Sequence, residues 1–187
     1  MAARLLLIRH GETVLGAQNR YAGRLDTPLT ANGRKQVLDL RPVFDQHSID
    51  RIYSSDLERC RETTRLLAPD REVVYSASLR ELAFGKWEGR TCEEINREQG
   101  ELYRRWMCDP LQVSPPDGES LVELSRRVTR FVGEIARDAP SSTIALITHG
   151  GPIRVLLEPD LSRAWSVAVP YASLIVHEWT NGCKEAS

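Results

Sequence analysis

The chain has 187 residues, of which 41% are hydrophobic, 25 are Lys or Arg and 26 are Asp or Glu, for a formal net charge of -1. This length and apolar content suffice for one well-buried core, so we expect a single domain over residues 1–187. The balanced charge favours neither nucleic acid nor an anionic membrane surface as a partner, and any anion site must therefore be local.

The sequence indicates no targeting segment, membrane span or cysteine framework. The first apolar run is only four residues long, from Leu5 to Ile8, whereas a spanning helix needs roughly twenty apolar residues. The sequence contains no Cys-x-x-Cys pair, which argues against a zinc ribbon and against a disulfide framework. The four cysteines are Cys60, Cys92, Cys108 and Cys183. We expect a cytoplasmic protein with reduced thiols.

Short apolar runs alternate with segments of helical period, which is typical of a layered α/β fold. The predicted strands are residues 4–9, 50–54, 72–75, 143–148 and 173–179. Thr30 is expected to cap a helix that runs to about Gln46 with a kink near Pro42. Asp56 is expected to cap a second helix, which turns four side chains inward. These are Leu57, Cys60, Thr64 and Leu67.

Two later helices are marked by capping-box spacing, Thr91 with Glu94 and Ser120 with Glu123. The apolar residues after Ser120 keep to one helical face and predict a core helix. They are Leu121, Leu124, Val128, Phe131, Val132 and Ile135. The segment 110–118 has no predicted structure, and we interpret it as an insertion over the site.

Two predicted strands each lead directly into a histidine. His10 follows the first strand and His149 follows the fourth. Open α/β sheets carry their chemistry where strands end in loops, so we expect both histidines to share one site. Each is followed by a glycine, Gly11 and Gly150, which lets a ligand approach the backbone.

The residue types at these strand ends fit a phosphoryl group. A neutral imidazole such as His10 is a nucleophile toward phosphorus when a carbonyl keeps its other nitrogen protonated. Arg9 and Arg59 supply cations whose guanidinium forks match paired phosphoryl oxygens. Arg59 also falls in the first turn of a predicted helix, where free N–H groups favour an anion. We expect Arg9, Arg59 and His149 to stabilise the phosphoryl oxygens.

A phosphohistidine pathway also needs a group that protonates the leaving oxygen and then activates the attacking water. We assign this role to Glu81, because it follows the third predicted strand among apolar neighbours that reduce its hydration. Glu88, in the same segment, is the alternative acid.

Four segments in this order carry a resemblance to a known family: 9–11, 53–63, 79–89 and 148–151. On these segments the chain resembles the histidine phosphatase superfamily, which includes cofactor-dependent phosphoglycerate mutases and many phosphomonoesterases. The resemblance implies a three-layer α/β/α sandwich whose sheet is mostly parallel with one antiparallel strand. It also implies that His10 is phosphorylated and that no metal or organic cofactor takes part.

Within that family, segments 21–30, 116–120 and 151–154 look most like bacterial α-ribazole phosphatase-type enzymes, which remove a 5′-phosphate during cobalamin assembly. The preferred interpretation is therefore a metal-independent phosphomonoesterase acting on a small molecule. Mutases of the family are usually longer, so a cofactor-dependent phosphoglycerate mutase is the second interpretation. A phosphate-binding module without turnover is a third.

One position departs from the family pattern. Gly16 stands where the family commonly carries an asparagine that bonds the phosphate. We expect either Asn19 to reach into the site or a water to replace the missing donor. Thr13 either bonds the phosphate or holds the loop.

Other interpretations stay open for several residues. His10, Glu12 and His149 are alternative metal ligands, although two histidines without helical His-x-x-x-His spacing make a poor zinc site. Arg154 is expected to be an ordinary surface cation. Three aromatic residues are expected to pack in the interior, with stacking on a ring-bearing substrate as the alternative. They are Trp87, Tyr103 and Trp106.

Overall fold

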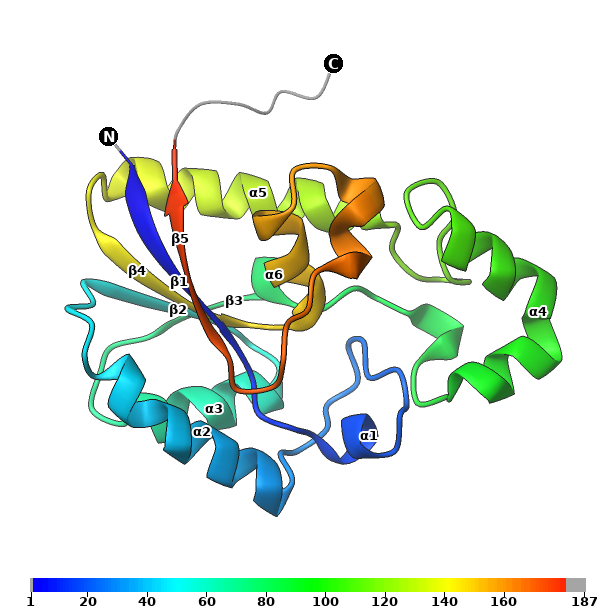
Figure 1. Cartoon of the computed structure of the whole chain (residues 1–187), viewed down its shortest axis with the longest axis horizontal. Coiled ribbons are helices and arrows are strands. Elements are labelled where there is room, and N and C mark those ends of the chain that lie inside the picture. The colour runs from blue at the N-terminus through cyan, green and yellow to red at the C-terminus, as the bar shows by residue number, and fades with distance from the viewer. Residues whose placement is uncertain (1, 181–187) are drawn as a thin grey trace.

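A computed structural model describes residues 2–180 of the chain, which contain one five-stranded sheet (Figure 1). Its strands are β1 (Ala3–Arg9), β2 (Arg51–Ser55), β3 (Val74–Ser76), β4 (Thr143–Thr148) and β5 (Leu174–Trp179). They lie in the order β3-β2-β4-β1-β5. All neighbours are parallel except β5, which pairs antiparallel with β1. The predicted mostly parallel sheet with one antiparallel strand is confirmed.

Helices cover both faces of this sheet. The helices of the described residues are α1 (Val14–Ala17), α2 (Ala31–Phe44), α3 (Glu58–Leu67), α4 (Cys92–Cys108), α5 (Leu121–Asp138) and α6 (Gly150–Leu157), of which α1 and α4 lie beside the sheet. Short 3-10 turns cover Ala77–Leu79, Gly85–Trp87 and Leu161–Ser166. Helices α2 and α3 lie on one face, and α5 and α6 on the other (Figure 1). The three-layer sandwich is therefore confirmed.

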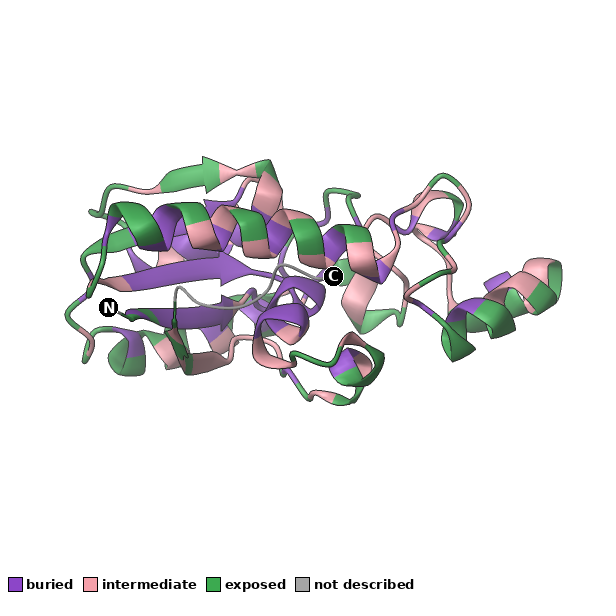
Figure 2. Ribbon diagram, turned by 90° about the horizontal axis from the view of Figure 1, so that it is seen from above, coloured by how far each residue is buried: buried purple, intermediate pink, exposed green. Residues whose placement is uncertain are grey.

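The alternation of side chains along β1 divides the core into two clusters. Leu5 and Leu7 pack in the cluster that contains the buried face of α5, whereas Leu6 and Ile8 pack in the cluster that contains buried residues of α2 and α3. Successive side chains of a strand point to opposite faces, so an uninterrupted apolar run is buried on both sides. Figure 2 shows the central strands as mostly buried, with the exposed and half-buried residues near their ends.

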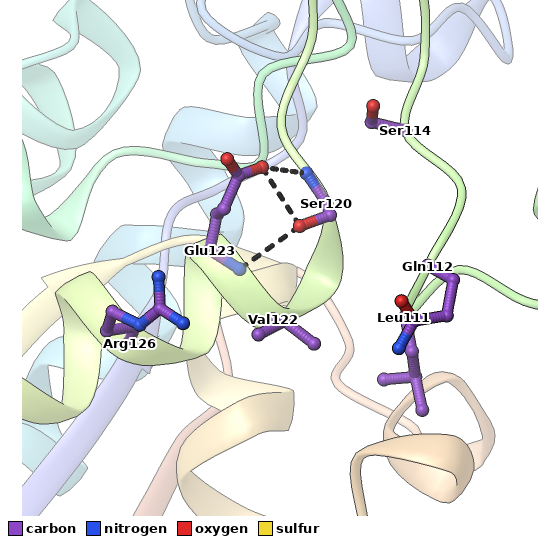
Figure 3. Close-up of a pocket in the computed structure, with 7 residues that line it drawn as sticks. All are labelled: Leu111, Gln112, Ser114, Ser120, Val122, Glu123 and Arg126. Carbon is purple, nitrogen blue, oxygen red and sulfur yellow. Dashed lines mark hydrogen bonds between the residues drawn. The ribbon is translucent and has the colours of Figure 1, made fainter.

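The capping signals fix where the two longest helices begin. The side chains of Thr91 and Ser120 accept hydrogen bonds from the backbone N–H groups of Glu94 and Glu123, three residues later. The carboxylates of Glu94 and Glu123 in turn accept from the backbone N–H groups of Thr91 and Ser120. Figure 3 shows the Ser120 box. The predicted apolar face of α5 is buried, except for Phe131, which is half-buried.

Other predicted boundaries shift. Helix α2 ends at Phe44, after passing through Pro42, and β3 covers only Val74–Ser76. The prediction that Asp56 caps α3 is wrong, because α3 begins at Glu58 and Asp56 instead pairs with Arg80 through both carboxylate oxygens, at 2.7 and 2.6 Å.

The aromatic residues around α4 pack against one another. Trp87 and Trp106 are both buried, with ring centroids 5.4 Å apart, and Tyr103 stacks on Trp106 at 5.9 Å. The Trp87 Nε1 donates to Gln99 Oε1 at 2.8 Å, at the residue where α4 leaves helical geometry. These contacts agree with packing and give no support to substrate stacking.

No helix in residues 2–180 combines the length and apolarity needed to cross a membrane. Cys60 is a buried free thiol, and Cys92 and Cys108 are exposed free thiols. Cys183 lies outside the described residues.

Leu146 on β4 is fully buried, whereas Leu38 on α2 is 48% exposed. We expect Leu146→Ala to lower the free energy of unfolding by about 2–5 kcal/mol, because the truncation leaves a cavity between two packed layers. The control Leu38→Ala should change it by less than about 0.5 kcal/mol. Denaturant titration followed by circular dichroism measures both values. Equal losses would contradict the two-sided burial of β4.

Candidate active site

The pairing of β1 with β4 brings the two predicted histidines together. Arg9 pairs with Thr148 at the end of the parallel ladder, and the N–H of His10 donates to the Thr148 carbonyl at 3.1 Å. The rings of His10 and His149 then meet edge to face, with centroids 5.1 Å apart. The structure therefore places both histidines in one site, as the strand ends predict.

A backbone contact fixes the tautomer of His10. Its Nδ1 lies 2.7 Å from the Gly11 carbonyl oxygen, which can only accept, so Nδ1 carries the proton. Burial lowers the pKa of His10 well below 6.5, and the positive charges of Arg59 and Arg9 lower it further. The ring is therefore neutral near pH 7, with the lone pair of Nε2 available for attack.

Arg59 and His149 orient each other. The Nε of Arg59 donates to His149 Nδ1 at 3.1 Å, so the His149 proton lies on Nε2, which is 2.8 Å from Ser55 Oγ. Burial, followed by Arg59 and the neighbouring His10, lowers the pKa of His149. The direct contact of His149 with phosphoryl oxygens stays a prediction, because both ring nitrogens are bonded to protein here.

Arg59 is a buried cation held by neutral acceptors. It is 1% exposed, and its terminal nitrogens donate to the carbonyls of Gly23 at 2.6 Å and Leu25 at 2.9 Å. Its helix α3 begins with Glu58, whose N–H donates to Asp26 Oδ1 at 2.9 Å. Arg59 thus lies in the first turn, as predicted, although the N-cap residue is Leu57 and the carboxylate that bonds the first turn comes from Asp26.

Glu81 also lies at this edge of the sheet. Its carboxylate accepts from the N–H of Gly151, at 3.0 and 3.3 Å, and from the N–H of Leu82 at 2.9 Å. Because Gly151 follows His149 by two residues, these bonds place Glu81 beside the second histidine motif.

A partly buried ion pair supports the Glu81 segment. Arg127 on α5 donates to the carbonyls of Ser78 and Glu81, each at 2.9 Å, and pairs with Glu119 through both carboxylate oxygens. Glu119 ends the 110–118 connection, and its N–H donates to the Ala83 carbonyl at 2.9 Å. The predicted insertion therefore packs against the segment that carries Glu81.

Glu88, the alternative acid, bonds to backbone. Its Oε1 accepts from the N–H groups of Arg24 at 2.9 Å and Phe84 at 3.1 Å. These bonds join the 20–26 loop to the Glu81 segment, which is a structural task. Glu12, the third ligand of the metal alternative, accepts from Thr30 Oγ1 at 2.7 Å. Among the described residues, no group of His, Cys, Asp and Glu side chains is arranged to hold a metal ion.

Arg9 lies between two segments that sequence reasoning does not join. It donates to the Val169 carbonyl, and its guanidinium lies over the Tyr171 ring, 3.9 Å from the centroid. A Cβ added to Gly150 would lie 3.6 Å from Arg9 Cζ and 2.7 Å from a terminal nitrogen of Arg154. The start of α6 therefore stands beside two guanidinium groups.

The expectation that Arg154 is an ordinary surface cation is wrong. Its Nε donates to the Val167 carbonyl at 2.9 Å, and burial lowers its pKa, which the negative charge of Glu81 opposes. The spacing in the sequence could have indicated this position, because Arg154 is four residues after Gly150 and therefore lies on the same side of a helix.

The predicted substrate-binding residues fall into different places. The N–H of Gly11 donates to Thr63 Oγ1 at 3.3 Å, and a Cβ at Gly11 would lie 2.4 Å from the Gly33 carbonyl, so close packing on α2 accounts for this glycine. The Thr13 side chain caps α1 by accepting from the N–H of Gly16. This contact agrees with the alternative that Thr13 holds the loop. Asn19 is exposed and left-handed, with a φ of 54°, and its contact with phosphate stays a prediction.

Sequence reasoning also missed Ser55 and Cys60, which surround His149. The Cys60 thiol lies 3.4 Å from His149 Nε2, and burial raises its pKa to about 12, so it stays protonated. A separate hollow between the 110–118 connection and α5 contains none of the predicted catalytic residues (Figure 3). It is lined by Leu111, Gln112, Ser114, Ser120, Val122, Glu123 and Arg126.

Residues 5–187 match the sequence model of the histidine phosphatase superfamily, branch 1. The chain belongs to the histidine phosphatase superfamily. It is 32% identical to an adenosylcobalamin/alpha-ribazole phosphatase of Salmonella typhimurium, over 98% of this chain and 89% of that protein. It is 34% identical to phosphoserine phosphatase 1 of Hydrogenobacter thermophilus, over 92% and 85% of the two chains.

The crystal structure of the alpha-ribazole phosphatase from Shigella flexneri has the same fold. It superposes with a TM-score of 0.85 at 31% identity, over 92% of this chain and 89% of that one. The family and these relatives support a phosphatase activity. They differ in their named substrates, so they do not give this histidine phosphatase a specific one.

The tautomers and pKa shifts of the two histidines generate a direct prediction. At pH 6.5, where an ordinary imidazole is half protonated, we expect His10 and His149 to be neutral because burial and Arg59 disfavour their cations. Long-range proton–nitrogen NMR on histidine-labelled protein, assigned with His10→Gln, should show a proton on Nδ1 of His10 and on Nε2 of His149. A midpoint of 6.5 or higher for His10 would contradict this environment.

The same shifts determine how stability depends on pH. The unfolded chain takes up these protons near pH 6.5, whereas the folded chain takes them up only at lower pH, so the free energy of unfolding falls as the pH drops below about 6.5.

Proposed function

We propose that this histidine phosphatase is a metal-independent phosphomonoesterase that works through a phosphohistidine on His10. The observation that carries the proposal is the Nδ1 contact of His10 with the Gly11 carbonyl, which leaves Nε2 unprotonated beside two arginines. A neutral nucleophile next to fixed cations suits attack on a phosphate dianion, because the cations offset charge that would otherwise repel the attacking group.

The first transfer forms the intermediate. The lone pair of His10 Nε2 attacks phosphorus, the bond from phosphorus to the leaving alcohol oxygen breaks, and Glu81 gives its proton to that oxygen. Arg9 and Arg59 stabilise the equatorial oxygens, and His149 keeps Nε of Arg59 in place. The products of this step are the alcohol, phosphohistidine and the Glu81 carboxylate.

The second transfer restores the enzyme. The Glu81 carboxylate takes a proton from water, the water oxygen attacks phosphorus, and the bond from phosphorus to Nε2 breaks. Inorganic phosphate leaves, with His10 neutral and Glu81 protonated again. Glu81 is suited to both steps because two backbone N–H groups fix the direction of its carboxylate.

For the physiological substrate we propose α-ribazole 5′-phosphate. The support is that the Salmonella and Shigella relatives are named alpha-ribazole phosphatases, together with segments 21–30 and 116–120 of this chain. The similarly close phosphoserine phosphatase makes phosphoserine the substrate to compare. A kcat/KM for α-ribazole 5′-phosphate that is not above that for phosphoserine would contradict this assignment.

We expect His10→Ala to reduce hydrolysis of an aryl phosphate by more than about a thousandfold, because the attacking atom is removed. Phosphate release is measured with a chelator present. The matched control is His47→Ala, since His47 lies outside every motif and should retain wild-type turnover. Loss of wild-type activity in chelator would disprove metal independence, and activity in His10→Ala would disprove the nucleophile.

We expect Glu81→Gln to act selectively on poor leaving groups. The amide keeps the acceptor for the Gly151 N–H but cannot supply a proton, so kcat/KM for an alkyl phosphate should fall by about 10²–10⁴-fold. An aryl phosphate, whose leaving oxygen needs little protonation, should lose much less. The measurement is kcat/KM across a series of leaving-group pKa values, and an equal loss throughout would remove Glu81 from this role.

A further inference from the structure

The loop before β5 carries Tyr171 into the site. The guanidinium of Arg9 lies 3.9 Å from the Tyr171 ring centroid, and the imidazole centroid of His10 lies 5.7 Å from it. The next residue, Ala172, donates its N–H to the His10 carbonyl at 3.0 Å. Tyr171 is thus held against the nucleophile and its neighbouring cation, although the proposed reaction uses neither its ring nor its hydroxyl.

The hydroxyl of Tyr171 occupies the space beside Gly16. A Cβ added to Gly16 would lie 2.3 Å from the Tyr171 hydroxyl oxygen and 3.1 Å from the ring carbon that bears it. Real Cβ atoms do not approach other atoms so closely, so a larger residue at position 16 would displace this hydroxyl. The position that lacks a phosphate donor in the sequence is therefore the position where a donor arrives from the β5 loop.

The hydroxyl is also chemically available. Within the described part of the chain it makes no hydrogen bond. A phenolic O–H is a good donor to a charged oxygen, and such bonds are stronger than bonds between neutral groups. The Tyr171 ring has a separate task, because its face holds the Arg9 guanidinium.

We propose that the Tyr171 hydroxyl donates a hydrogen bond to the phosphoryl group and so replaces the side chain that Gly16 lacks. This inference rests on the proposed function of the same site. It makes Tyr171 a phosphate-binding residue, with its ring positioning Arg9 and its hydroxyl contacting the ligand.

The first test removes only the hydroxyl. Tyr171→Phe keeps the ring under Arg9, so we expect the equilibrium affinity for inorganic phosphate to fall about tenfold or more. The KM for an aryl phosphate should rise with it, while kcat changes less, because the bond forms already in the ground state. Calorimetry measures the phosphate affinity, and wild-type affinity in Tyr171→Phe would overturn the proposal.

Tyr75→Phe is the matched control. Tyr75 lies on the edge strand β3 and also carries an arginine over its ring, with Arg61 4.1 Å from the centroid. Loss of its hydroxyl should leave phosphate affinity unchanged. A loss equal to that of Tyr171→Phe would overturn the proposal, because it would show a general effect of removing the hydroxyl.

The second test exchanges the two donors. Gly16→Asn should weaken phosphate binding in the wild-type chain, because its side chain displaces the Tyr171 hydroxyl. In a Tyr171→Ala chain the same substitution has room and supplies an amide donor, so it should strengthen phosphate binding. Equal weakening in both backgrounds would overturn the proposal.

Phosphate affinity needs no turnover, so the two proposals fail separately. A chain that binds phosphate through Tyr171 but hydrolyses no phosphomonoester would overturn the proposed function and support this inference. If the wild-type chain hydrolyses aryl phosphate through His10 and Tyr171→Phe binds phosphate normally, the proposed function is supported and this inference is overturned.

Discussion

The parallel pairing of β1 with β4 is the constraint on which the site depends. Because Arg9 pairs with Thr148, the two strands end at one level, and the histidines that follow leave neighbouring strands at the same edge. A shift of either strand by one residue would turn its apolar side chains toward the wrong cluster. The packing of the core therefore fixes the distance between His10 and His149, and catalysis inherits a geometry that hydrophobic burial maintains.

The burial of Arg59 gives this geometry its electrostatic character. A buried guanidinium is costly unless its N–H groups are bonded, and here they bond to two carbonyls and to His149. These bonded acceptors are neutral, so no direct ion pair neutralises the guanidinium, although the negative charges of Glu81, Asp26 and Glu88 act on it from a distance. The same charge disfavours the cationic forms of both histidines, and in the proposed reaction it attracts a phosphate dianion. In the proposed reaction, one cation thus prepares the nucleophile and the ligand site together.

Segments that are distant in sequence complete the site through backbone contacts. Glu81 reaches the start of α6 by accepting from Gly151, and Arg127 holds the Glu81 carbonyl from α5. Tyr171 enters from the loop before β5 because Ala172 bonds to the His10 carbonyl. Glu81 and Tyr171 are therefore positioned by the same two strand ends that carry the histidines.

The sequence by itself determined the strands, the capping boxes and the histidine motifs, because each depends on periodicity or side-chain type within a few residues. The sequence-based prediction for Asp56 was wrong, because its carboxylate bonds to Arg80 through both oxygens and does not cap a helix. The sequence could not place Arg154 or Tyr171, whose surroundings are made by α6, the β5 loop and α1 together. Only the tertiary structure decided where these two side chains lie and what they contact. Their partners are brought near by strand pairing and core packing, which act over long separations in sequence.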